Sequence, residues 1–357
     1  MALQLLLVLV LLQAAQPQPH APALRASASA AQQPPAAAPR FLRYLPSALE
    51  REWTANIHEW QRDICERLGA PGGARADVQR LLDALDQQHY EGDGGLPAGA
   101  GARALDALEA DGLLSIMEYS LGGSGEVVRV RLAPLVGMLR DPRIGCPPHA
   151  YGTGPFTELR GVDMYEQWQV QSRMWLFMDP RAAALHRGAR ALLLDLGAST
   201  WNHAAGSRWI SQRLEAQGVR FEHVWAWEAS RVEPRDYFRG ADPLQLAALH
   251  FYNWPVSAAP GAPDNPWTLL AAKAAPSDHV VVKLDIDTEA IDNPLARQVL
   301  DDPALLARVD ELFFEMHFSN PAMDWLWKND GFTSSVEDTY KLFSQLRHKG
   351  VRANPWP

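Results

Sequence analysis

The chain has 357 residues, of which 47% are hydrophobic, so it can bury one large core or two modest ones. Its formal net charge is −9 and it has no run of five basic residues, which argues against nucleic acid or a polybasic membrane contact as partners. Two cysteines, Cys65 and Cys146, either form one disulfide or stay as free thiols, and two alone cannot build a zinc site.

The N-terminal segment predicts a targeting signal. Leu5–Leu12 is a short apolar run, below the length that spans a bilayer, and Ala14 and Ala15 supply small residues near a cleavage point. We therefore expect a signal peptide or signal anchor over 1–15 and a secretory-pathway or extracellular location, with organelle targeting as the alternative. Residues 16–40 are rich in Pro and Ala, and we expect a disordered linker there.

An α-rich region is expected over 41–157. Apolar residues at helical spacing predict helices over 41–92, interrupted by glycine and proline. The runs 113–119 and 126–133 flank the segment GGSG, and the second alternates apolar and polar residues, so together they predict a β-hairpin. Residues 140–156 are rich in Pro and Gly and are expected to form a connector.

From 158 to 357 the pattern alternates between strands and helices, which is the signature of β–α–β units. Long apolar runs predict buried parallel strands over 190–196, 222–228, 248–253, 279–286 and 310–318, with a short edge strand in the C-terminal tail. We expect helices near 163–177, 206–217, 265–275, 289–300 and 335–349. The predicted fold class is thus α/β, with a doubly wound, mainly parallel, Rossmann-like sheet.

Acidic residues follow the first two predicted strands of this sheet. Asp195 stands at the end of the first strand, directly before a Gly197 turn, and Glu228 ends the second. Ligands of open α/β sheets bind at the carboxyl ends of the strands, where a carboxylate can accept hydrogen bonds from both hydroxyls of a ribose. The alternative is that each acid caps the helix that follows it.

These residues resemble a known family, the class I S-adenosylmethionine-dependent methyltransferases, and more narrowly the FkbM-like branch. The D-x-G-A motif of the first strand is matched by Asp195, Gly197 and Ala198, and the ribose-binding acid of the second by Glu228. The resemblance implies that these four residues bind S-adenosylmethionine. Trp254, which follows the third strand, corresponds to the place where the family contacts adenine.

The later strands extend the resemblance. The family's K-x-D-x-(E/D)-G-x-E pattern is matched in part by KLDIDTE over 283–289, and its E-x-H by Glu315 and His317. The resemblance implies an O-methyltransferase for a small hydroxylated or glycan acceptor, with Asp285, Glu315 and His317 facing that acceptor and no metal. Histidine suits proton transfer near neutral pH, and alone it would be interpreted as a hydrogen-bonded residue at a strand end.

Two other functions remain open. Asp285 and Asp287 form an Asp-x-Asp after an apolar strand, and on a true strand both point to one face, where they would hold the divalent metal of a glycosyltransferase. The segment 199–201 (STW) replaces the second glycine of the methyltransferase turn, which favours a non-catalytic binding protein on a degenerate fold. His203, in the loop after Gly197, is a weaker candidate site residue.

Overall fold

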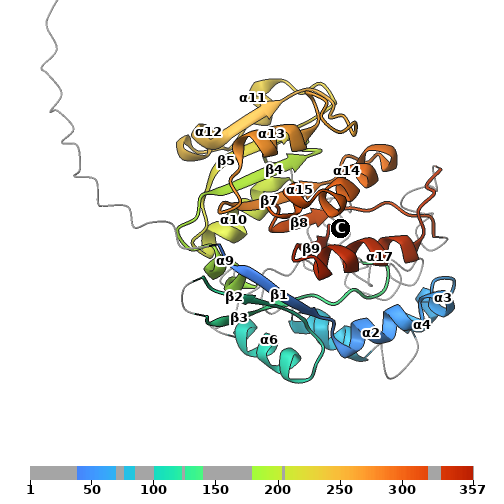
Figure 1. Cartoon of the computed structure of the whole chain (residues 1–357). Coiled ribbons are helices and arrows are strands. Elements are labelled where there is room, and N and C mark those ends of the chain that lie inside the picture. The colour runs from blue at the N-terminus through green and yellow to red at the C-terminus, as the bar shows by residue number, and fades with distance from the viewer. Residues whose placement is uncertain are drawn as a thin grey trace, which may run out of the picture. The chain divides into compact units, whose positions relative to one another are not determined.

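The fold is described from a computed structural model. It describes residues 38–69, 76–84, 100–122, 125–139, 179–202, 206–320 and 331–356. Residues Ala36–Pro357 form one compact unit (Figure 1). The predictions for 1–15, for most of the linker, for the 140–156 connector, for the 163–177 helix, for the Cys65–Cys146 pairing and for His203 lie outside the described residues. None of the described helices is long and apolar enough to cross a membrane.

A six-stranded sheet forms the centre of the α/β part, and its strands are all parallel. Their order across the sheet is β6-β5-β4-β7-β8-β9. The strands are β4 (Ala191–Leu196), β5 (Phe221–Trp227), β6 (Leu249–Tyr252), β7 (His279–Leu284), β8 (Glu311–Phe314) and β9 (Arg352–Pro355). Every residue of β4, β7, β8 and β9 is buried, as expected for strands covered on both faces.

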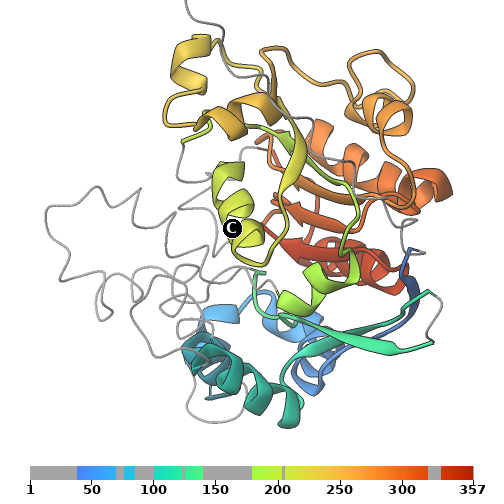
Figure 2. The same ribbon diagram turned by 90° about the vertical axis from the view of Figure 1, so that its left-hand side faces the viewer.

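Helices cover both faces of this sheet. Because side chains alternate along a strand, Leu192 and Leu194 of β4 join one apolar cluster while Ala191 and Leu193 join another. The first cluster receives α13 (Pro266–Lys273), α14 (Glu289–Asp301) and α17 (Val336–His348), and the second receives α10 (Ser207–Ala216). Figure 2 shows yellow-green α10 on one side and the orange and red helices on the other.

The order of elements confirms the predicted α/β class and its parallel sheet. Each of the five predicted strands is present, and the tail forms the expected edge strand β9. Four short helices were not predicted: α9 (Pro180–Leu185), α11 (Pro234–Tyr237), α12 (Pro243–Ala248) and α15 (Pro303–Leu306). Each begins at a proline, a residue that is favoured in the first turn of a helix. In a sequence alone, such a proline is usually interpreted as part of a loop.

The N-terminal region contains a three-stranded antiparallel sheet as well as helices. Its strands are β1 (Arg40–Leu45), β2 (Ser115–Ser120) and β3 (Val127–Leu132), in the order β1-β2-β3. The helices are α2 (Ala48–Ala55), α3 (Ile57–Trp60), α4 (Ile64–Gly69), a helix over 76–84, and α6 (Ala100–Ala110). The helical prediction from residue 41 was therefore wrong for β1. Pro46 disfavours a helical conformation at Leu45, so the segment pairs with β2 instead.

The N-terminal region and the large sheet share one core. Trp53 and Trp60 belong to the same apolar cluster as the β4 leucines. A buried ion pair also crosses between them: Arg347 Nη1 of α17 lies 3.3 Å from the carboxylate of Glu50 in α2 and donates to the Tyr44 hydroxyl at 3.0 Å. These contacts fix the N-terminal helices against α17.

Candidate functional site

The order of strands reverses at β4, and this reversal locates the candidate site. From β4 the chain proceeds first to β5 and β6 on one side and then to β7, β8 and β9 on the other. In open α/β sheets such a switch point opens a crevice at the carboxyl ends of the strands. Asp195 in β4 and Asp285 directly after β7 lie at this place, so the sheet brings two predicted site residues together.

A buried lysine joins these two acids. Lys283 Nζ lies 3.3 Å from Asp195 Oδ1 and 3.2 Å from Asp285 Oδ2, and it donates to Gly197 O at 2.7 Å. Burial opposes the charge on Lys283, but the carboxylates of Asp285 and Asp195 outweigh it and raise the lysine's pKa. Lys283 therefore stays protonated, which suits it for fixing the two strand ends and not for removing a proton.

The Gly197 turn packs against β7. Gly197 has φ +85°, and a Cβ atom there would lie 1.6 Å from Asp285 O. The amides of Gly197 and Ala198 both donate to Trp227 O, at 3.1 and 2.9 Å. The glycine is thus required by the close approach of two strand ends, while the following turn is held by β5.

One residue of the segment 199–201, Ser199, adopts a glycine-like backbone. Ser199 has φ +49°, in the left-handed region that few non-glycine residues occupy. Trp201 is buried in the apolar cluster with Ile210 and Tyr237, and its amide donates to Tyr237 O at 3.1 Å. The turn therefore keeps a left-handed step, with the indole ring packed into the core.

Glu228 connects the loops that follow β4 and β5. Its Oε2 accepts from the Ser199 amide at 2.8 Å and its Oε1 from the Ser230 amide at 2.7 Å. Asn253 Nδ2 donates to the Glu228 carbonyl at 2.7 Å. Each carboxylate oxygen has two lone pairs, so a half-buried Glu228 can hold the loops and still accept hydrogen bonds from a ligand.

Trp254 lies apart from the buried group. Its side chain is 64% exposed, just beyond the end of β6. Trp225 and Trp227 of β5 are both buried in the first apolar cluster. Tyr252 stacks on Trp227 with ring centroids 4.9 Å apart and is itself partly exposed. Aromatic surface is therefore available next to the β5 and β6 ends.

The two acids of the Asp-x-Asp segment have different surroundings. Strand β7 ends at Leu284, and Asp287 has φ +60°, so the predicted strand to 286 was wrong at its last two residues. The Asp285 side chain is 15% exposed and accepts from Trp356 Nε1 at 3.1 Å, whereas the Asp287 side chain is 83% exposed. The left-handed residue turns the chain, so the two carboxylates do not share a strand face.

Asp287 instead approaches the residues that follow β8. That strand ends at Phe314, and Glu315 and His317 lie in the segment after it, both buried. One oxygen or nitrogen from each of Asp287, Glu315 and His317 lies within 4.8 Å of the other two. A side-chain hydrogen bond also connects Glu315 with Asp285, so the three predicted acceptor-facing residues do lie near one another.

Two residues of the site were missed at the sequence level. Lys283 was noted only as part of a motif, although its ion pairs join the ends of β4 and β7. Trp356 lies in the tail beyond β9, and its ring stands 5.6 Å from Lys283 Nζ. Nothing in the local sequence places a tail residue beside β7, because that neighbourhood depends on the order of β7, β8 and β9.

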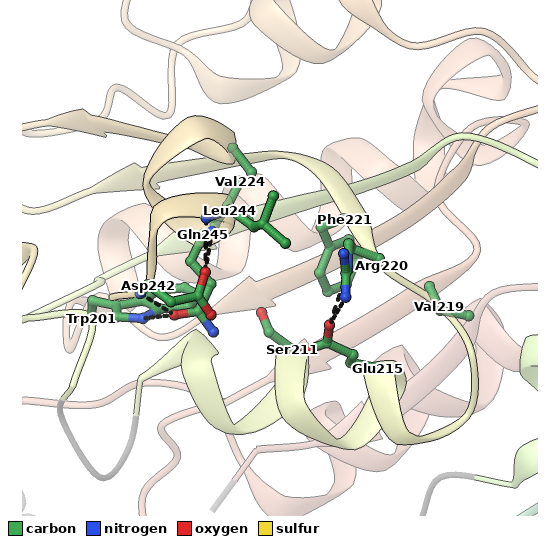
Figure 3. A pocket seen from close by; sticks show the side chains of 11 residues that line it. Trp201, Ser211, Glu215, Val219, Arg220, Phe221, Val224, Asp242, Leu244 and Gln245 are labelled. Atoms are coloured by element: carbon green, nitrogen blue, oxygen red, sulfur yellow. Dashed lines mark hydrogen bonds and ion pairs between the residues drawn. The ribbon is translucent and has the colours of Figure 1, made fainter. Parts of the chain in front are cut away.

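A separate pocket lies between α10, α12 and the start of β5 (Figure 3). Its lining residues include Trp201, Leu244 and Phe221. The acidic residues predicted for the site, Asp195, Glu228, Asp285 and Glu315, do not line it. An ion pair of 2.7 Å between Arg220 and Glu215 borders it. It opens at the amino end of β5, away from the strand ends where ligands of such sheets bind.

Comparison with known proteins gave no match. We found no matching family model, no similar curated protein and no similar solved structure. Any assignment of function to this chain therefore depends on the residues themselves.

Proposed function

We propose that the chain is a methyltransferase-like protein that binds S-adenosylmethionine on a doubly wound, Rossmann-like sheet. The observation that carries the proposal is the position of Glu228 and the Gly197 turn, at the carboxyl ends of neighbouring parallel strands beside the point where strand order reverses. The left-handed Ser199 supports it, since this backbone supplies the step for which the family uses glycine.

Each residue has a distinct role in this proposal. Glu228 accepts hydrogen bonds from the ribose hydroxyls, the turn at Gly197 and Ala198 supplies backbone contacts, and Trp254 offers an aromatic face to adenine. Asp195 contributes indirectly, because its ion pair with Lys283 holds the turn against β7. The bound cofactor would supply an electrophilic methyl group.

On the acceptor side, Asp285, Glu315 and His317 orient a hydroxyl group and take up its proton. The acceptor in this proposal is a small hydroxylated molecule or a glycan, encountered in the secretory pathway. The rate gain comes mostly from positioning, because holding oxygen and methyl group in line makes the reaction effectively unimolecular.

Calorimetric titration with S-adenosylmethionine tests the proposal. We expect saturable binding to one site, weakened at least about tenfold, or about 1.4 kcal/mol, in Glu228→Gln. Glu222→Gln is the matched control, because Glu222 lies at the opposite end of the same strand and its variant keeps full affinity. The absence of binding heat and of a thermal shift at millimolar ligand in the folded wild-type chain would refute the proposal and leave a non-catalytic binding protein.

The glycosyltransferase alternative is less well supported. It needs Asp285 and Asp287 to hold one ion together, yet Asp285 is engaged by Lys283 and the Trp356 indole while Asp287 faces solvent near His317. The positions of these side chains favour a methyltransferase-like function over a metal-dependent glycosyltransferase.

A further inference from the structure

The cluster of Asp287, Glu315 and His317 combines two carboxylates and one imidazole from two different strand ends. Asp287 follows β7, and the other two follow β8. His317 Nε2 lies 3.5 Å from Asp287 Oδ1, and all three donor atoms are within 4.8 Å of one another. Ligands about 2.1 Å from a shared ion stand about 3 to 4 Å apart, so small side-chain rotations bring these atoms into coordination distance.

The backbone on both sides of Asp287 is held in place by hydrogen bonds to Asp292. The buried carboxylate of Asp292 accepts from the amides of Ile286 and Thr288, at 3.2 and 3.0 Å, on both sides of Asp287. The His317 ring packs near Phe332, with centroids 5.0 Å apart. Both ligand-bearing segments are therefore positioned by residues outside the cluster, as in preformed metal sites.

Further acidic side chains lie around the cluster. Asp285 and Glu315 have little exposure and share a side-chain hydrogen bond, which requires one proton between the two carboxyl groups. Asp292 is also buried, and burial raises its pKa to about 7. Lys283 already shares its single positive charge between Asp195 and Asp285. Carboxyl groups this close are held together by a shared proton, and a bound cation can take the place of that proton.

The donor set indicates which ion fits. One imidazole with two carboxylates suits Mn²⁺, Fe²⁺ or Zn²⁺, whereas Mg²⁺ and Ca²⁺ prefer oxygen ligands alone. Two of the ligands are buried and the third, Asp287, is 83% exposed on its side chain. An ion bound here would thus have protein on one side and open coordination positions for water or a ligand on the other.

We propose that Asp287, Glu315 and His317 form a binding site for one divalent transition-metal ion, of the Mn²⁺ or Zn²⁺ class. This site is independent of the proposed S-adenosylmethionine contacts at Glu228. It changes two assignments: a His317 that binds a metal ion through Nε2 cannot also use that nitrogen as a base, and Glu315 becomes a ligand of the ion. An acceptor hydroxyl would then be oriented by the ion and by Asp285.

Metal binding to the untagged full-length chain, first stripped with a chelator, tests the site. We would titrate Mn²⁺ followed by electron paramagnetic resonance, and Zn²⁺ by calorimetry. One ion per chain is expected, with affinity falling at least tenfold in Asp287→Asn and in His317→Gln. Asp287→Asn is the decisive variant, because an exposed side chain can change without disturbing the fold.

The control is His250→Gln. His250 Nε2 lies 2.9 Å from His223 Nδ1, which makes this pair the natural competitor for a histidine-bound ion. Full affinity in His250→Gln supports the proposed site. The proposal is overturned if no saturable binding occurs, if Asp287→Asn and His317→Gln bind as well as wild type, or if binding is lost in His250→Gln.

The same variants separate this site from the proposed function. Glu228→Gln should bind the metal ion normally, and Asp287→Asn should bind S-adenosylmethionine normally in the presence of chelator. Failure of one binding reaction therefore leaves the other unaffected.

Discussion

At the residue scale, Gly197 is needed for the packing of the candidate site, because only a residue without a side chain fits against the Asp285 carbonyl. We expect Gly197→Ala to lower the free energy of unfolding by at least about 3 kcal/mol, because the new Cβ would overlap the Asp285 carbonyl and force the backbone to shift. The measurement is urea denaturation followed by tryptophan fluorescence.

Gly218→Ala is the matched control for this prediction. Gly218 has the same φ of +85°, but a Cβ there has nothing within 4 Å. Gly218→Ala should lower the free energy of unfolding by only about 1 to 2 kcal/mol, which is the cost of placing an alanine in the left-handed conformation. Equal losses in the two variants would show that the contact with β7 is unimportant.

The sequence predicted where some residues of the candidate site lie in the sheet, and it did not predict the contacts of others. Glu228 and Gly197 were predicted because strand ends are recognisable locally, and the carboxyl ends of parallel strands always share an edge. The partnership of Lys283 with Asp195 depends on β4 lying next to β7, which no local pattern encodes. The same reason explains why Asp287 was assigned to Asp285 and not to His317.

At the element scale, the apolar runs located strands reliably but overestimated their ends. The run HVVVKLDI carries apolar residues as far as Ile286, yet the left-handed Asp287 and the amides held by Asp292 end the strand at Leu284. Strand β1 was missed for the opposite reason, since six residues before a proline carry little periodic signal. The secondary structure of such short segments is determined by the strand with which they pair, which for β1 is β2.

A second element-scale feature is the buried histidine pair where α9, β7 and β9 meet. His279 stacks on His186 with centroids 4.2 Å apart, and burial, aided by the charge of Arg352, lowers the pKa of His279 to about 3. The unfolded chain protonates this histidine below pH about 6.5, so between those two pH values only the unfolded state gains a proton. Acid therefore destabilises the fold through His279.

His279→Gln isolates this effect. The wild type should lose stability relative to the variant as pH falls from about 6.5, by up to about 1.4 kcal/mol per pH unit. Asp310 has the opposite effect on stability. Burial raises its pKa to about 7, so protonation of Asp310 favours the folded state as the pH falls. Both proteins contain Asp310, so its contribution cancels when their free energies of unfolding are compared. Parallel stability curves between pH 7 and pH 4.5 would contradict the assignment.

At the scale of the whole molecule, the N-terminal region and the sheet are joined by polar as well as apolar contacts. Glu50 accepts from the Tyr44 hydroxyl at 2.6 Å, from the Ser115 hydroxyl at 2.7 Å and from the Leu135 amide at 2.9 Å, in addition to its ion pair with Arg347. The sequence predicted two regions from a change in pattern. It gave no sign that they share a core, because that depends on which surface of α17 the early helices cover.

This shared core predicts that the two regions unfold together. Arg347 and Glu50 are both buried, so Arg347→Met leaves a carboxylate uncompensated and should destabilise the chain by about 3 to 5 kcal/mol. Lys341→Met, on the exposed side of the same helix, should cost less than about 1 kcal/mol although it also loses an ion pair, with Glu337. Far-ultraviolet circular dichroism and tryptophan fluorescence should report one coincident transition in the wild type. Two separated transitions, or equal losses in the two variants, would mean that the buried pair does not couple the N-terminal helices to the sheet that carries the candidate site.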